Sequence, residues 1–167
     1  MTDGPRVLGI DPGLNITGYA VLEFQAGRPT LREAGVVRSR ARQSLGARLA
    51  DIYVGVREVL AAFEPQVMAV EELYSHYQRP RTAILMGHAR GVICLAAAQS
   101  EITLRHYAAT QVKRLLTGSG RATKSQVQQA ICREFSLPAP PEPPDVADAL
   151  AIALCHCFLA NNKVNPP

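Results

Sequence analysis

This sequence lacks the features that mark membrane proteins, secreted proteins and disulfide-stabilised domains. Its 167 residues include no tryptophan and only four cysteines. No stretch approaches the ~18 consecutive apolar residues of a membrane-spanning helix. The opening MTDGPRVLGI has no basic segment followed by a long apolar one, so it does not read as a secretion signal. We therefore expect a cytoplasmic protein that does not associate with membranes.

The cysteines do not form the C-x-x-C pairs of common zinc sites. Cys155 and Cys157 flank His156, which could indicate a metal site. On a helix, however, residues two positions apart point to nearly opposite sides. Buried, reduced thiols are therefore the favoured interpretation.

Acidic residues are scarce in the middle of the chain. Between residues 73 and 133 there are nine Lys or Arg residues and one acid, Glu101, a net charge of +8. Because the whole chain carries +4, the remaining residues carry −4. This contrast favours a polyanion-binding surface beside an acidic site. Charge alone supports equally well the simpler interpretation of solvated helix charges.

Hydrophobic patterning predicts a single domain built from one mixed five-stranded sheet flanked by helices, an α/β fold. Residues 1–160 would form this domain, and residues 161–167 a short polar tail. The Pro-rich segment PAPPEPP cannot be helical and would lead into the last helix. The expected strands are 5–11, 17–25, 31–38, 66–70 and 102–107, and the expected helices are 44–63, 82–99, 109–116, 123–134 and 144–160.

Two glycines lie one turn apart in the Ala-rich helix predicted over 82–99. Gly weakens a helix, so Gly87 and Gly91 suggest the close approach of another element. That element could be the sheet of this domain or a second subunit.

Acidic residues stand at the ends of predicted core elements. Asp11 ends the first strand, Glu71 and Glu72 follow the run QVMAV, and Asp145 and Asp148 open the last helix. Each has an ordinary explanation, as a turn former or as a partner of a helix dipole. If they converge, their charges repel, and divalent cations would relieve the repulsion.

Carboxylate oxygens favour hard cations such as Mg²⁺ or Mn²⁺ over zinc. Two such ions can stabilise the attacking and leaving oxygens of a phosphodiester. With a basic segment to hold the phosphate backbone, the pattern predicts metal-dependent phosphodiester hydrolysis.

Four ordered blocks resemble one family across about the whole chain: GIDPGLNITGYAV, AVEELY, QVKRLLTGSGRATKSQVQ and DVADALAIAL. They are similar to RuvC, the bacterial Holliday junction resolvases. The resemblance implies an RNase H-like fold, a homodimer, two Mg²⁺ ions per site with Mn²⁺ as a substitute, and nicking of two opposing strands of a four-way DNA junction. It also implies cooperation with the branch-migration proteins RuvA and RuvB, and a location in the bacterial cytoplasm.

The family's catalytic, metal-binding acids fall on Asp11, Glu71, Asp145 and Asp148 of this sequence. Strand alternation leaves open whether Glu71 or Glu72 faces the metals, and the resemblance selects Glu71. Lys113 and Lys124 fall at family positions that contact or neutralise phosphate, and Tyr74 falls where the family usually has a Phe that stacks on a junction base. Ser125 is a further candidate for a hydrogen bond to phosphate. The loop around Tyr74 varies in the family, and its residues His76, Arg79 and Arg81 are additional candidate DNA contacts.

Three other functions are weighed against this one. An ATPase of the actin and sugar-kinase type also begins with a strand and an Asp-x-Gly turn, but it needs two lobes. A related nuclease of the YqgF type shares the GIDPG opening but not the later blocks. A DNA-binding module without catalysis would have no use for acids that repel DNA unless metals lie among them.

Overall fold

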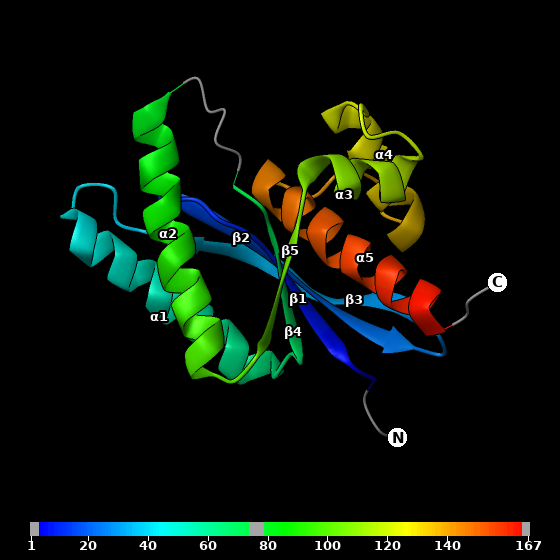
Figure 1. Ribbon diagram of the computed structural model, residues 1–167, viewed down its shortest axis with the longest axis horizontal. Helices are drawn as coiled ribbons and strands as arrows, with labels where there is room; N and C mark the ends of the chain where they lie inside the picture. Colours follow the sequence, from blue (N-terminus) through cyan, green and yellow to red (C-terminus); the bar gives the residue numbers. More distant parts are fainter. Residues whose placement is uncertain (1–3, 74–78, 165–167) are drawn as a thin grey trace.

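Five strands form one mixed sheet with helices on both faces (Figure 1). The computed structural model describes residues 4–73 and 79–164, except for the side chains of residues 161–164. The sheet order is β3-β2-β1-β4-β5, which confirms the predicted five-stranded mixed α/β fold. The elements are β1 (Arg6–Asp11), β2 (Ile16–Gln25), β3 (Arg28–Arg38), α1 (Leu45–Phe63), β4 (Val67–Glu71), α2 (Pro80–Gln99), β5 (Thr103–Tyr107), α3 (Ala109–Thr117), α4 (Lys124–Phe135) and α5 (Pro144–Val164).

The first three strands form an antiparallel meander, and β4 and β5 add in parallel. The β2–β3 turn is tighter than the sequence predicted, because Gln25 and Arg28 already pair in the ladder. Only Ala26 and Gly27 form the turn, with φ values of 51° and 79°. A two-residue hairpin loop needs such positive φ values, so β3 begins three residues earlier than expected.

Alternation along the strands sends side chains to two separate cores. Leu8 and Ile10 of β1 pack with Met68 and Val70 of β4 under α1 and α2. Val7 and Ala69 point to the other face and pack against α5. Residues 9 and 11 of β1 and residue 71 of β4 share this second face because the side-chain period of a strand is two. The face covered by α5 therefore receives the acids that end β1 and β4.

The helix ends follow local rules. Helix α2 begins at Pro80, two residues before the predicted start, and α5 begins at Pro144, because proline fits the first turn of a helix.

Cys155 and Cys157 are buried in the α5 core, and burial raises the pKa of each thiol to about 12. Among the described residues, no helix combines the length and apolarity needed to cross a membrane.

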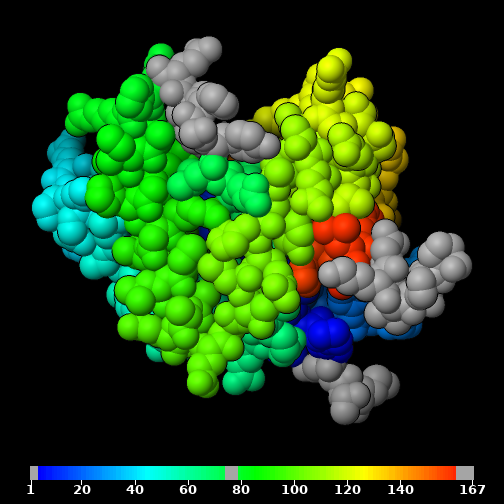
Figure 2. Space-filling model, in the orientation of Figure 1, coloured from blue at the N-terminus to red at the C-terminus, as the bar shows by residue number. Residues whose placement is uncertain are grey.

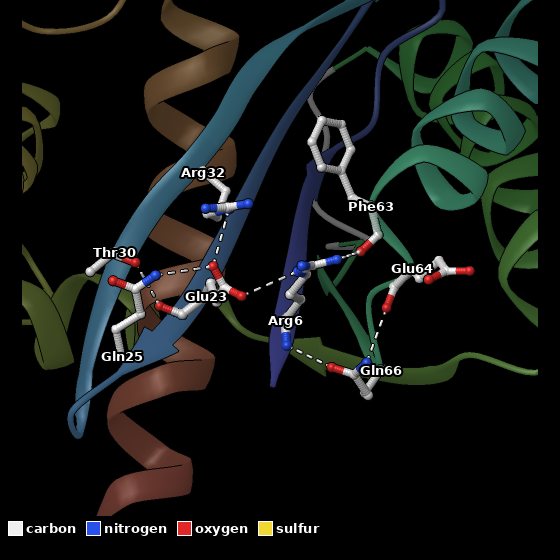
Figure 3. Close-up of polar contacts among 8 residues, drawn as sticks. All are labelled: Arg6, Glu23, Gln25, Thr30, Arg32, Phe63, Glu64 and Gln66. Atoms are coloured by element: carbon white, nitrogen blue, oxygen red, sulfur yellow. Dashed lines mark hydrogen bonds and ion pairs between the residues drawn. The ribbon is translucent and has the colours of Figure 1, made fainter. Parts of the chain in front are cut away.

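A buried carboxylate ties the sheet together at the end far from Asp11 (Figure 3). Glu23 is fully buried, and its oxygens lie 3.4 Å from Nε of Arg6 and 3.1 Å from Nε of Arg32. Arg6 also donates to the carbonyl oxygen of Phe63 at 2.9 Å. This network joins β1, β2 and β3 to the end of α1, at the end of the sheet opposite Asp11.

Candidate active site

Two strands deliver the first pair of acids. Asp11 is the last residue of β1 and Glu71 is the last residue of β4. The strands are parallel neighbours, with Ile10 opposite Val70, so the next residues of the two strands lie side by side. Both side chains point to the α5 face, whereas Glu72 is exposed. The fold thus places the carboxylate of Glu71, rather than that of Glu72, beside Asp11.

Helix α5 delivers the second pair of acids because two glycines let it lie close to the sheet. A Cβ at Gly9 would come 2.2 Å from the carbonyl oxygen of Ala149, and a Cβ at Gly18 would come 2.1 Å from that of Asp145. Any larger residue at either position would push the helix away. Asp145 lies in the first turn of α5 and Asp148 one turn later.

The electrostatics link the other three acids to Asp11. Burial, followed by the charges of Asp148, Asp145 and Glu71, raises the pKa of Asp11 from 3.8 to about 8, against an opposing effect of Lys124. Burial also raises the pKa of Asp148 and of Glu71, and the charge of Asp148 adds to the rise at Glu71. We call these four residues the carboxylate cluster; their full ionisation is unfavourable without a cation.

Two lysines border the carboxylate cluster. Nζ of Lys124 lies 3.2 Å from Oδ2 of Asp148, and the charge of Lys113 lowers the pKa of Glu71. Lys124 is the first residue of α4, whose start is fixed by a capping box between Thr123 and Gln126. The lysines and acids line a cavity of about 250 Å³ between α3, α4 and α5, with Glu71, Lys113, Lys124 and Asp148 as its charged residues.

The donor set fits a hard divalent cation, because every acid of the cluster offers only carboxylate oxygens. Among the described residues, no three acidic, histidine or cysteine side chains are gathered closely enough to hold an ion in their present positions. Burial and then repulsion from the other acids raise the pKa of Asp11, and this repulsion opposes closer approach of the carboxylates. A cation would remove this repulsion, so the chemistry of the cluster suits a metal that completes the site on binding.

A larger hollow, of about 860 Å³, lies between β3 and α1 on the other face of the sheet. Its lining includes Asp51, whose carboxylate accepts from Nε and Nη2 of Arg40 at 3.1 and 2.9 Å. That ion pair neutralises the carboxylate and lowers its pKa. The hollow therefore lacks the excess negative charge that distinguishes the carboxylate cluster.

The other predicted DNA contacts are distributed around the cluster. Ser125 is exposed on the first turn of α4, and Arg79 and Arg81 are exposed at the start of α2, outside the lining of the 250 Å³ cavity. Tyr74 and His76 lie outside the described residues.

Sequence reasoning missed Arg90 of α2, whose guanidinium donates to the carbonyl oxygen of Glu71. An arginine inside an Ala- and Gly-rich helix was the only available signal.

Comparison with known proteins gives consistent matches along the chain. The family described as "Crossover junction endodeoxyribonuclease RuvC" matches residues 7–156. A protein of that name from Rhodopirellula baltica is 57% identical over 159 residues, covering 95% of this chain and 89% of the relative. One from Desulforamulus reducens is 44% identical over 150 residues, covering 90% and 91%.

A solved structure, "T. thermophilus RuvC in complex with Holliday junction substrate", superposes with a TM-score of 0.88. It is 34% identical, and the match covers 95% of this chain and 96% of that one. The fold of this chain is therefore RNase H-like, as the resemblance implied.

Proposed function

The chain belongs to the RuvC family of crossover junction endodeoxyribonucleases, and from this premise we propose that it resolves Holliday junctions in recombination and repair. The observation that carries the proposal is the carboxylate cluster, in which Glu71 and Asp148 share a cavity with Lys113 and Lys124. In the same cluster, burial and three neighbouring acids raise the pKa of Asp11 to about 8. A site with this charge distribution suits a cation and a phosphate together.

In the proposed mechanism, Mg²⁺ would be held by Asp11, Glu71, Asp145 and Asp148, with two ions per site, for which Mn²⁺ would substitute. When bound, such ions supply Lewis-acid stabilisation of the attacking and leaving oxygens at phosphorus. Water attacks phosphorus in line and loses a proton as its oxygen bonds to phosphorus. The bond from phosphorus to the 3′ oxygen breaks, and that oxygen takes up a proton to leave as the hydroxyl. The products are a 5′-phosphate and a 3′-hydroxyl, with no covalent enzyme intermediate.

The lysines position the substrate in this proposal. Lys113 and Lys124 border the cavity beside Glu71 and Asp148, where an ammonium group can contact a phosphate oxygen. The ion pair between Lys124 and Asp148 also offsets charge in the cluster before DNA arrives. The remaining contacts would come from Ser125, Arg79 and Arg81, and from Tyr74 by stacking on a junction base.

We further propose that two copies pair through α2, in a dimer whose two-fold symmetry would match that of the junction. Helix α2 lies along the outside of the molecule (Figure 2). Its outer face carries Ile84 and Leu95, 61% and 49% exposed, and a Cβ at Gly87 or Gly91 would meet nothing within 4 Å. Small residues flanked by exposed apolar ones suit close helix contact.

The dimer is tested by Gly91→Glu, with Gly46→Glu as the matched control because Gly46 is also unobstructed but lies on α1. We expect the first variant to sediment as a monomer and the control to sediment like the wild type. Equal sedimentation of all three proteins would contradict pairing through α2.

The family resemblance also suggests RuvA and RuvB as partners and the bacterial cytoplasm as the location. Residues 1–160 are proposed as the single nuclease domain, followed by the polar segment 161–167.

The proposal is tested by incubating the purified protein with a labelled mobile four-way junction and with linear duplex of the same sequence. Mg²⁺, Mn²⁺ or EDTA is included, and Asp11→Asn is run in parallel. We expect paired, symmetric nicks in the junction only, dependent on the metal and absent in the variant, which still binds. If the protein binds the junction equally well with and without the metal and does not cut it, a DNA-binding module without catalysis would be favoured instead.

A further inference from the structure

Arg90 reaches from α2 to the strand end that carries Glu71. Its Nη1 donates to the backbone carbonyl oxygen of Glu71, and its Nη2 contacts Nδ1 of His106 on β5. Because a guanidinium can only donate, Nδ1 of His106 accepts and the proton of the ring lies on Nε2. One side chain thus joins α2 to β4, whose last residue is Glu71, and to the neighbouring strand β5.

These contacts complete the fixation of the Glu71 main chain. On its C-terminal side, the N–H of Glu72 donates to the carbonyl oxygen of Tyr107 at 2.8 Å. Arg90 holds the intervening carbonyl, so the peptide between residues 71 and 72 is bonded on both sides. The guanidinium charge also opposes the rise in the pKa of Glu71. A rotation of this peptide would move the Glu71 carboxylate relative to Asp11.

Arg90 occupies the flank of α2 between two different faces. Ala89 and Ile93 are buried against the sheet, whereas Gly91 and Leu95 are exposed on the outer face. The packing of Ala89 and Ile93 on the sheet therefore brings the Arg90 guanidinium to Glu71 of β4 and to His106 of β5.

We propose that Arg90 is a positioning residue that couples the seating of α2 to the placement of the Glu71 carboxylate. This inference rests on the proposed resolvase function.

The test compares Arg90→Gln, Arg90→Lys and Arg90→Ala with the control Arg57→Gln. Arg57 of α1 also ties down α2, through the hydroxyl of Ser100 at 3.0 Å, but at the C-terminal end of that helix. We expect the single-turnover cleavage rate of Arg90→Gln to fall about 10- to 100-fold, as for other groups that orient metal ligands. Junction affinity stays within about twofold of wild type, because the loss is in the cleavage step.

Two further readouts separate positioning from a general loss of structure. Guanidinium ions at concentrations below those that unfold the protein should restore cleavage by Arg90→Ala but not by Asp11→Asn. Hydrogen exchange should show faster exchange of the Glu72 amide in Arg90→Gln and no change there in the control. Arg90→Lys, which keeps a donor for one of the two contacts, should be intermediate in rate.

The inference is overturned if Arg90→Gln cuts the junction as fast as the control, or if its affinity and rate fall together. Absence of rescue by guanidinium would also overturn it. Failure of the wild type to cut would instead refute the proposed function, so the two failures are distinguishable.

Discussion

Replacing Asp11 with asparagine should stabilise the metal-free protein, and the gain should grow with pH. In the folded state the pKa of Asp11 is raised from 3.8 to about 8 by burial and by Asp148, Asp145 and Glu71. An unfolded chain releases this proton near the ordinary value. Between these two pKa values the folded protein binds more protons, so its stability falls as the pH rises. The asparagine side chain carries no charge, so the stability of the variant does not fall with pH for this reason.

The size of the effect follows from the shift. About four pH units at ~1.36 kcal/mol each set a ceiling of about 6 kcal/mol. Water entry and the nearby Lys124 reduce the cost of the ionised form, so we expect the variant to gain about 2 to 3 kcal/mol at pH 8.5 and almost nothing at pH 4.

Urea unfolding followed by circular dichroism in EDTA, at several pH values, measures the difference. The matched control is Asp51→Asn, because Arg40 lowers the pKa of Asp51 and removal of that carboxylate should bring no gain. Adding Mg²⁺ should stabilise the wild type and leave Asp11→Asn unchanged, since ligands that bind the folded state stabilise it. A variant less stable than wild type at pH 8.5, or a difference that does not change with pH, would refute the electrostatic argument.

Three other outcomes are expected. Gly9→Ala brings a Cβ to 2.2 Å from the carbonyl oxygen of Ala149. The variant should be less stable by about 1 to 3 kcal/mol, as measured by thermal unfolding. A melting temperature equal to that of the wild type would contradict the close packing of α5. Glu23→Gln leaves two arginines without their buried counter-charge and should cost about 3 kcal/mol in urea; no loss would mean that the network is dispensable. Lys124→Gln should lower the rate of cleavage about 100-fold. The stability of the protein should change little, because the ion pair between Lys124 and Asp148 is exposed to solvent. An unchanged cleavage rate would exclude a role for the ammonium group.

Much of this protein is determined locally by its sequence. The alternating apolar runs specify five strands, and the prolines at residues 80 and 144 start two helices at the only kind of helical position that tolerates them. Acids placed directly after strands already indicate a charged edge, because strand ends are where a buried sheet meets solvent. The family resemblance then names the four acids.

Only the tertiary structure determines how close the four acids lie to one another. Whether Asp145 and Asp148 approach Asp11 depends on how closely α5 lies on the sheet, and that distance is set by Gly9 and Gly18, which contact residues more than a hundred positions away. The raised pKa of Asp11, the pairing of Lys124 with Asp148 and the bond from Arg90 to Glu71 follow from the same packing. The hydrophobic pattern of a sequence indicates which face of a strand or helix is buried. The distance between two charged side chains depends on how all the elements between them pack.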